Sequence, residues 1–191
     1  MTSTVKSQQL RGPAGSQFSE HRKREALHFA FGTCSLGVVL VASTRQGICS
    51  ILLGDDPAAL MQELKGHFRT TNVISGGPGL ERQVAAVVDL VEAPCTASAL
   101  PLDIRGTPFQ QQVWKALRTI PAGQTVSYTE LAHRIGSPSA FRAVAGACAA
   151  NPLAVAVPCH RVVRKDGGLS GYRWGVVRKQ ALLEREKRMS V

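Results

Sequence analysis

The sequence has no apolar run close to the roughly 20 residues that a membrane-spanning helix needs. Its amino terminus also lacks the apolar core of a secretory signal. Aromatic residues make up only 5% of the 191 residues, and the five cysteines include no C-x-x-C pair. An odd number of cysteines without that spacing argues against a disulfide framework and against a zinc ribbon. We therefore expect a soluble cytoplasmic protein with no membrane partner.

Acidic residues are scarce in the carboxyl-terminal part of the chain. Residues 106–191 contain 13 Lys and Arg but only 4 Asp and Glu, whereas residues 1–105 contain 10 and 9. Most of the net charge of +10 therefore lies after residue 105. A compact basic segment favours a polyanionic partner, nucleic acid before an anionic membrane. A solvated basic face without a partner is the alternative interpretation.

The composition predicts an ordered protein with two parts. Hydrophobic residues make up 44% of the chain, which excludes a wholly disordered protein. Residues 1–25 are polar and are predicted to form a disordered tail. Residues 26–98 are predicted to form a small α/β domain, residues 99–106 a linker, and residues 107–191 a mainly α-helical domain. The expected fold class is α+β overall.

The first part has the pattern of a small sheet with helices. Runs rich in Val, Ile, Leu and Phe are typical of strands; they are Leu27–Phe31, Leu36–Ala42 and Ile48–Leu53, with breaks expected at Gly32, Gly37 and Gly47. Asp56-Pro57 is a helix-start signal, and the apolar spacing that follows predicts a helix before a loop over Thr70–Gly79. A second helix is predicted over Leu80–Val91. The cysteines here, Cys34, Cys49 and Cys95, are expected to be small buried apolar residues.

Capping signals predict three helices in the second part. Thr107 with Gln110 and Ser127 with Glu130 have the spacing of capping boxes, so helices are expected from these points to about Thr119 and Ile135. A further helix is predicted from Pro138 to about Ala150, and its tight connection to the preceding helix is typical of a helix-turn-helix. It consists of small residues with one long cation, Arg142. Such a helix suits either close approach to a partner or close packing in the core.

A candidate reactive centre follows these helices. The apolar run Leu153–Val157 predicts a buried strand, and it leads into Pro158, Cys159, His160 and Arg161. Nearby positive charge lowers the pKa of a cysteine and a histidine can act as its base, so this pattern favours a nucleophilic thiol. Adjacent Cys and His chelate a single metal poorly. A buried structural cysteine is the alternative.

Residues 158–162, PCHRV, resemble the active-site signature of the O6-alkylguanine-DNA alkyltransferases, also called methylated-DNA–protein-cysteine methyltransferases. Further blocks resemble this family in the same order; they are Gly106–Trp114, Ser127–Ala132, Arg142–Val144 and Gly171–Gly175. The resemblance is strongest over residues 101–187 and weaker over 28–69. It is greatest to the carboxyl-terminal half of Ada-type proteins. It implies direct-reversal repair, with irreversible transfer of an alkyl group from O6 of guanine, less often O4 of thymine, to the protein.

The resemblance assigns a role to each residue of the centre. Cys159 is expected to accept the alkyl group, and His160 to take its proton through a bridging water. Glu186 is expected to orient His160, and Asn151 to brace the turn. Tyr128 is expected to hydrogen-bond the guanine and to supply a proton as O6 leaves.

The resemblance also implies base flipping in double-stranded DNA that contains O6-alkylguanine. Arg142 is expected to fill the gap in the stack, although a structural ion pair is the alternative for this residue. The remaining residues of the helix that enters the minor groove are expected to be Ala140, Ala143, Gly146 and Ala147. The base pocket is expected to be lined by Pro158, Val162, Tyr172 and Arg173.

One feature limits what the resemblance implies. Some family members hold zinc in their amino-terminal part, but the corresponding stretch, Ser43–Cys49, contains a single cysteine. We therefore expect no metal. We also expect no cofactor, and a monomer that associates with the nucleoid if the protein is bacterial. The competing hypotheses are a non-enzymatic binder of alkylated DNA, which Cys159 argues against, and a helix-turn-helix transcription regulator. A base-reading helix would carry several polar side chains where this one has only Arg142.

Overall fold

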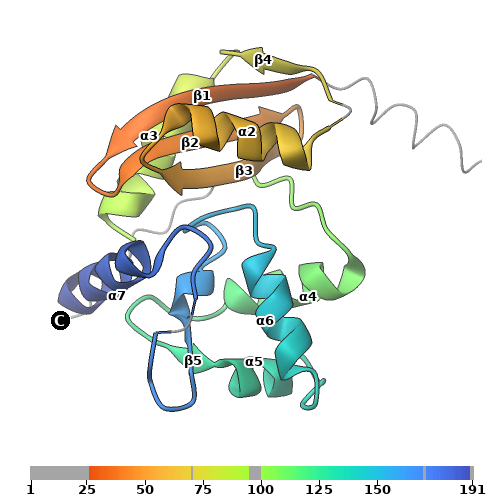
Figure 1. The fold of residues 1–191 in the computed structure, drawn as a ribbon, viewed down its shortest axis with the longest axis vertical. Helices are drawn as coiled ribbons and strands as arrows, with labels where there is room; N and C mark the ends of the chain where they lie inside the picture. Colours follow the sequence, from red (N-terminus) through yellow and green to blue (C-terminus); the bar gives the residue numbers. More distant parts are fainter. Residues whose placement is uncertain (1–25, 70, 95–99, 170, 190–191) are drawn as a thin grey trace, which may run out of the picture.

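The computed structural model describes residues 26–69, 71–94, 100–169 and 171–189. The predicted tail and Cys95 lie outside the described residues. Figure 1 shows two parts along the long axis of the molecule, a sheet with helices above and a mainly helical part below. The predicted α+β class is confirmed.

The upper part is a four-stranded sheet in the order β3-β2-β1-β4. Its strands are β1 (Leu27–Cys34), β2 (Gly37–Thr44), β3 (Gly47–Gly54) and β4 (Val73–Ser75). The first three are antiparallel neighbours, and β4 pairs in parallel with β1. In Figure 1, α2 (Pro57–His67) lies in front of this sheet and α3 (Leu80–Glu92) lies behind it. Helices on both faces explain why β2 and β3 are apolar and buried along most of their length.

Two details of the sheet differ from expectation. Gly32 lies inside β1 and does not end it. A glycine is needed at this position because α3 passes so close that a Cβ would lie 2.6 Å from Val84. The segment predicted as a loop before Gly79 contains β4, which is too short for composition to reveal. Gly37 and Gly47 do stand at turns, with φ of 107° and 145°.

The lower part contains the second group of elements; they are α4 (Pro108–Leu117), β5 (Val126–Ser127), α5 (Tyr128–Arg134), α6 (Phe141–Ala149), the 3-10 helix η1 (Cys159–Arg161), β6 (Val162–Val163) and α7 (Val176–Met189). Both predicted capping boxes are present, Thr107 with Gln110 and Ser127 with Glu130. Among the described helices, none combines the length and the apolar character needed to cross a bilayer.

Two predicted elements of the lower part were wrong. Instead of starting at Pro138, α6 starts at Phe141, because Ser137 closes a turn in which its carbonyl accepts from the Ala140 amide (2.9 Å). The run Leu153–Val157 is not a strand either. Only Leu153 bridges to the sheet, at Ile51, and the chain turns at Val155 with φ of 56°.

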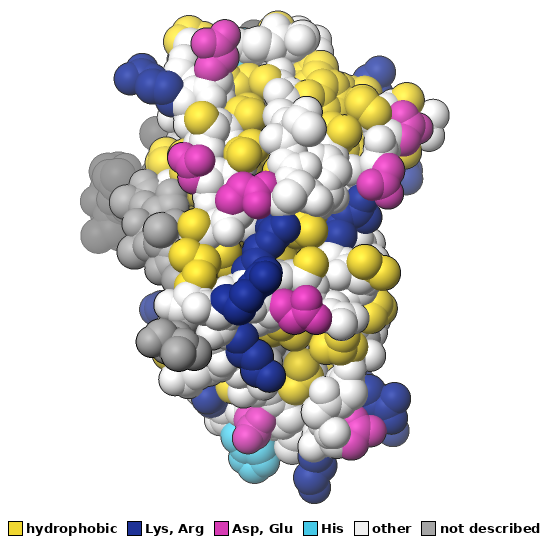
Figure 2. Space-filling model, turned by 90° about the vertical axis from the view of Figure 1, so that its left-hand side faces the viewer, with side chains coloured by type: hydrophobic (Ala, Val, Ile, Leu, Met, Phe, Trp, Pro, Cys, Tyr) yellow, Lys and Arg dark blue, Asp and Glu magenta, His cyan; other side chains and the backbone are white. Residues whose placement is uncertain are grey.

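The two parts meet along β3 and α7. Ile48 of β3 donates to the Pro101 carbonyl (2.8 Å), so this residue of the predicted linker lies along the sheet. On α7, Arg178 pairs with Asp55 (2.6 Å) and Arg185 lies 3.6 Å from Glu92. Figure 2 shows Lys and Arg side chains following one another down one face of the molecule, with acidic side chains beside them. Buried apolar side chains of both parts form one continuous core.

Candidate active site

Cys159 lies at the start of η1, in the lower part of the molecule. Its side chain is buried, and its amide donates to the Val157 carbonyl (2.8 Å). The strand that follows, β6, pairs in parallel with β5, which places Ser127 beside Val163. The residue after Ser127, Tyr128, is the first residue of α5, and it is half-buried against the core.

Asn151 holds the turn that leads to Cys159. Its Oδ1 accepts from the Leu153 amide (3.0 Å), and its Nδ2 donates to the Val157 carbonyl (2.8 Å). The same Nδ2 lies 3.2 Å from Sγ of Cys159. Because this side chain satisfies backbone groups of residues 153–157, the apolar run can turn where the sequence pattern predicts a strand. The contacts match the bracing role expected for Asn151.

Glu186 of α7 is the centre of a buried polar network. Its Oε1 accepts from Nε2 of His160 (2.8 Å) and from Nη2 of Arg161 (2.9 Å), and its Oε2 accepts from the Gly123 amide (3.0 Å). Burial raises the pKa of a carboxyl, but the hydrogen bonds from His160 and Arg161 outweigh it and lower the pKa of Glu186 to about 2. Glu186 is therefore an anion that orients His160, as the resemblance implies.

His160 presents a free proton acceptor. Burial lowers its pKa, while the hydrogen bond and charge of Glu186 act in the opposite direction. A neutral imidazole that donates from Nε2 to Glu186 keeps its lone pair on Nδ1. That Nδ1 is buried and has no hydrogen-bond partner. A buried acceptor without a partner, on the residue next to Cys159, is suited to receive the thiol proton.

The thiol itself is not ionised by its surroundings. Burial raises the pKa of Cys159 to about 11, although the Asn151 hydrogen bond and the charge of Lys179 lower it. Neighbouring cations do lower this pKa, but desolvation has the larger effect, so the expected net pKa below that of a free thiol was wrong. The guanidinium of Arg161, two residues from Cys159 in the chain, binds Glu186 and the Ile120 carbonyl and not the thiol. The resting thiol is protonated at neutral pH and needs a base to become a nucleophile.

Lys179 is a residue of the site that the sequence reasoning missed. Its side chain is fully buried, and Nζ donates to the Val162 carbonyl (2.5 Å). Lys179 shares one face of α7 with Leu182 and Glu186, three and seven residues further on, and all three are buried. A lysine on the apolar face of a helix was the signal that could have revealed it, because buried lysines are rare.

The expected base-pocket residues fall into two groups. Pro158 and Val162 are both buried, and they lie close to Cys159 in the sequence. The Tyr172 ring lies edge-on to His160, with centroids 6.4 Å apart, and its hydroxyl is buried without a partner. Arg173 differs from expectation, because its guanidinium binds Glu63 and His67 of α2 and is not free to line a pocket.

The exposed face of α6 matches only part of the expected DNA surface. Arg142, Ala143 and Gly146 are exposed, and Ala140 is partly exposed. Ala147 is buried and its carbonyl accepts from Nε1 of Trp114 (2.9 Å), so its assignment to this surface was wrong. Arg142 forms no ion pair with any described residue. Its guanidinium lies 5.3 Å from the ring centroid of Phe141.

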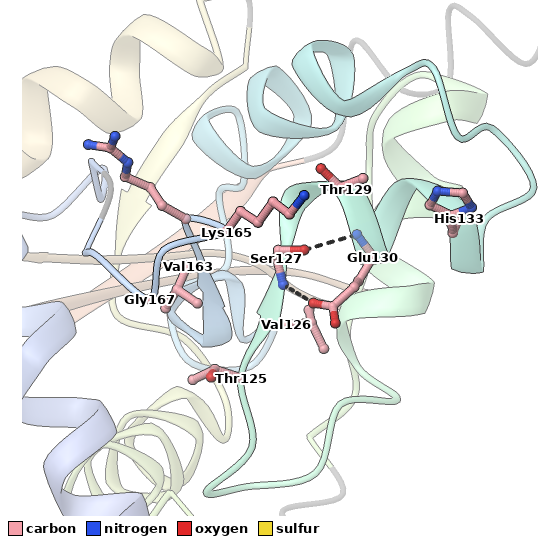
Figure 3. A pocket seen from close by; sticks show the side chains of 10 residues that line it. Thr125, Val126, Ser127, Thr129, Glu130, His133, Val163, Lys165 and Gly167 are labelled. Carbon is pink, nitrogen blue, oxygen red and sulfur yellow. Dashed lines mark hydrogen bonds between the residues drawn. The ribbon is translucent and has the colours of Figure 1, made fainter.

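A hollow of about 460 Å³ opens beside the start of α5. It is lined by residues of α5, by β5 and by the loop after β6, including the cations Arg164 and Lys165. In Figure 3, Lys165 points toward Thr129, and the hydrogen bonds between Ser127 and Glu130 close the first turn of the helix. Neither Cys159 nor Tyr128 lines it. Within the described part of the chain, no three His, Cys, Asp or Glu side chains are grouped as a metal site requires.

Comparison with known proteins places this site in a family. A family model described as "6-O-methylguanine DNA methyltransferase, DNA binding domain" matches residues 108–188. An inducible methylated-DNA–protein-cysteine methyltransferase of Bacillus subtilis is 38% identical over 151 residues, which cover 78% of this chain and 84% of that protein. This chain belongs to the O6-methylguanine-DNA methyltransferase family. The predicted family is confirmed.

Other members of the family agree in sequence and in structure. The bifunctional transcriptional activator/DNA repair enzyme Ada of Escherichia coli is 52% identical over 181 residues, which cover 95% of this chain and 51% of Ada. The chain thus spans about half the length of this relative. The crystal structure of Mycobacterium tuberculosis OGT in complex with DNA matches with a TM-score of 0.71 at 37% identity, covering 84% of this chain and 93% of that one.

Proposed function

We propose that the protein repairs DNA by moving an alkyl group from O6 of guanine to Sγ of Cys159, once per molecule. The observation that carries this proposal is the buried Cys159 thiol next to His160, whose Nδ1 has no partner while Nε2 binds Glu186. Relatives named methylated-DNA–protein-cysteine methyltransferases support the same reaction.

The reaction needs one proton transfer and one substitution. His160 takes the thiol proton at Nδ1 through a water molecule, and the Glu186 carboxylate stabilises the resulting imidazolium. The thiolate of Cys159 then attacks the alkyl carbon, so that an S–C bond forms as the C–O6 bond breaks. Tyr128 supplies a proton to the leaving guanine and regains one from solvent. The His160 imidazolium releases its proton to solvent, so that overall the thiol loses one proton and the guanine gains one. The thioether is stable, so the protein is not regenerated.

The extruded base would be held between the turn of Cys159 and the loop of Tyr172. Pro158 and Val162 offer apolar contacts, and the buried Tyr172 hydroxyl offers a hydrogen-bonding group that has no partner among the described residues. Burial raises the pKa of Tyr172, so this hydroxyl keeps its proton and can donate it to a base.

Duplex DNA would contact the exposed face of α6, with α5 and α6 acting as a helix-turn-helix. The small residues Ala140, Ala143 and Gly146 allow close approach in the minor groove, and Arg142 fills the gap left by the flipped base. The cations at the rim of the hollow, Arg164 and Lys165, are placed to neutralise the DNA backbone. The M. tuberculosis OGT complex, a structure with DNA, supports duplex DNA as the partner.

We place the boundary between the two domains at residues 99–106.

The intact mass of the protein after incubation with duplex DNA containing O6-methylguanine tests this function. We expect a gain of one methyl group, which peptide mapping locates on Cys159. Cys159→Ser should take up no methyl group while it still binds DNA. The nearest alternative acceptor in sequence, Cys148, is buried and its pKa is raised to about 12, so it should remain unmodified. Binding without a mass gain in the wild type would instead support a non-enzymatic binder or a regulator.

A further inference from the structure

Arg173 connects the loop of the base pocket to the amino-terminal part of the molecule. Its Nε and Nη2 lie 2.8 and 2.7 Å from Oε1 of Glu63, and Nη2 also lies 2.7 Å from Nε2 of His67. Glu63 and His67 are four residues apart on α2, so both face the guanidinium from one side of that helix. Nη1 reaches the carbonyl of Ala149, the last residue of α6, at 3.4 Å.

The geometry requires a neutral His67. An arginine only donates hydrogen bonds, so Nε2 of His67 must accept and carry no proton. Burial and the charge of Arg173 lower the pKa of His67, against the opposite effect of Glu63, in agreement with this arrangement. The Arg173 side chain is only 19% exposed, which strengthens its pairing with Glu63 relative to a pair in open solvent.

Two of the segments that Arg173 joins, its own loop and the end of α6, continue into the proposed active site. Tyr172, the preceding residue, lies edge-on to His160 and to Trp174. Asn151, two residues after Ala149, contacts Sγ of Cys159. The positive charge of Arg173 also lowers the pKa of Cys159. A change at α2 can therefore move the pocket loop without touching the thiol.

We infer that Glu63 and His67 are positioning residues for alkyl transfer, acting through Arg173 on the loop that holds the base. This inference rests on the proposed function. It gives the amino-terminal part a role in the reaction, namely to fix Tyr172 at the distance from His160 that the extruded base requires. The competing role for the same contacts is to hold the two parts of the protein together.

A matched pair of variants separates the two roles. Glu63→Gln removes the charge that holds Arg173, whereas Glu92→Gln removes a charge at the same boundary that pairs with Arg185 and does not touch the pocket loop. Both variants should lower the melting temperature to a similar degree, since each ion pair is partly exposed. Single-turnover alkylation of Cys159 by free O6-benzylguanine then measures the pocket without the cost of base flipping.

We expect Glu63→Gln to raise the half-saturating concentration of O6-benzylguanine about tenfold, with less change in the rate at saturation. His67→Gln, which keeps a neutral acceptor, should retain most of the wild-type affinity, whereas His67→Lys should behave like Glu63→Gln. Arg173→Gln should show the same defect, and adding Glu63→Gln to it should cause no further loss, because both changes break one contact.

Two results would overturn the inference. One is a Glu63→Gln variant whose half-saturating concentration equals that of Glu92→Gln, which would leave a purely structural ion pair. The other is full additivity of Glu63→Gln and Arg173→Gln. Failure of the proposed function is distinct from both, because the wild-type protein would then show no alkylation of Cys159 by either DNA or the free base.

Discussion

At the scale of single residues, the proposed mechanism assigns to His160 the step that turns the Cys159 thiol into a nucleophile. Burial protects the thiol and raises its pKa to about 11, so few molecules carry a thiolate at neutral pH. The neutral imidazole of His160 offers its unpaired Nδ1 to the proton, and Glu186 holds the ring through Nε2. In the proposed mechanism the thiolate is thus formed only as the proton moves, between two buried side chains.

Replacing His160 by Ala should change the pH dependence of transfer as well as its rate. Burial lowers the pKa of His160 below its ordinary value, so the wild-type rate should be nearly constant above pH 7 and fall only in more acidic solution. His160→Ala must use free thiolate, whose fraction rises about tenfold per pH unit up to the thiol pKa near 11. Single-turnover rates with O6-benzylguanine between pH 6 and 10 measure this slope.

The control for this experiment is His28→Ala. His28 binds the Gly76 carbonyl in the upper part of the molecule and lies away from the thiol. It should keep the wild-type profile. A His160→Ala profile as flat as that of the wild type would remove His160 from the proton path.

At the scale of elements, α6 presents a cation on a helix of small residues. Arg142 has no carboxylate partner among the described residues, and its guanidinium lies over the exposed ring of Phe141. A cation–π contact at an exposed site stabilises by only about 0.5–1 kcal/mol. The contact with Phe141 therefore holds the Arg142 side chain only weakly, as the proposed insertion into DNA requires.

Arg142→Ala should slow repair of duplex DNA far more than reaction with the free base. Extruding a base costs a few kcal/mol, and an inserted side chain offsets part of that cost. The reaction of free O6-benzylguanine needs no extrusion, so its rate should stay within about twofold of the wild type, since an exposed side chain contributes little to the fold. The duplex defect should shrink when the damaged base lies opposite a weak pairing partner.

Arg134→Ala is the matched control, because it removes the same charge from the exposed end of α5. It should weaken binding to DNA without a selective loss on paired over weakly paired substrates. An equal loss of rate for Arg142→Ala on duplex and free base would assign Arg142 to the fold or the active site.

The sequence was sufficient where a local signal determines the structure. Both capping boxes predicted where α4 and α5 begin, since side chain and backbone meet within three residues. The sequence was insufficient where a side chain outside the segment determines the backbone conformation. The run Leu153–Val157 has the pattern of a strand, but Asn151 takes the backbone hydrogen bonds that a strand would need.

The same limit applied to the site. Cys159 and His160 are adjacent in the chain, so both could be placed in one site from the sequence, and Glu186 followed from the family resemblance. The orientation of Arg173 toward α2 depends on Glu63, 110 residues earlier, and no spacing along the chain encodes it. The effect of burial on the Cys159 pKa likewise depends on the packing of the whole lower part.

At the scale of the whole molecule, most of the positive charge lies in the part of the chain that contains the proposed active site. Residues 1–105 are nearly neutral, with 10 basic and 9 acidic residues, while residues 106–191 carry an excess of 9 basic residues. Several of these cations are used internally, by Glu186, Glu63 and Asp55. The cations left on the surface, Arg142, Arg164 and Lys165 among them, lie near the proposed DNA-binding face.

Binding to undamaged duplex DNA should therefore weaken steeply with salt, while reaction with the free base should not. Each phosphate that a protein cation neutralises contributes about −0.9 to the slope of log K against log salt, so four contacts correspond to about a hundredfold loss between 50 and 200 mM. Titrations of a labelled duplex over this range measure the slope, and Lys165→Gln should reduce it by about one contact. The O6-benzylguanine rate in the same buffers is the control, because the free base carries no phosphate. A binding constant that does not change with salt would show that the excess charge faces solvent without a polyanionic partner, the alternative that composition left open.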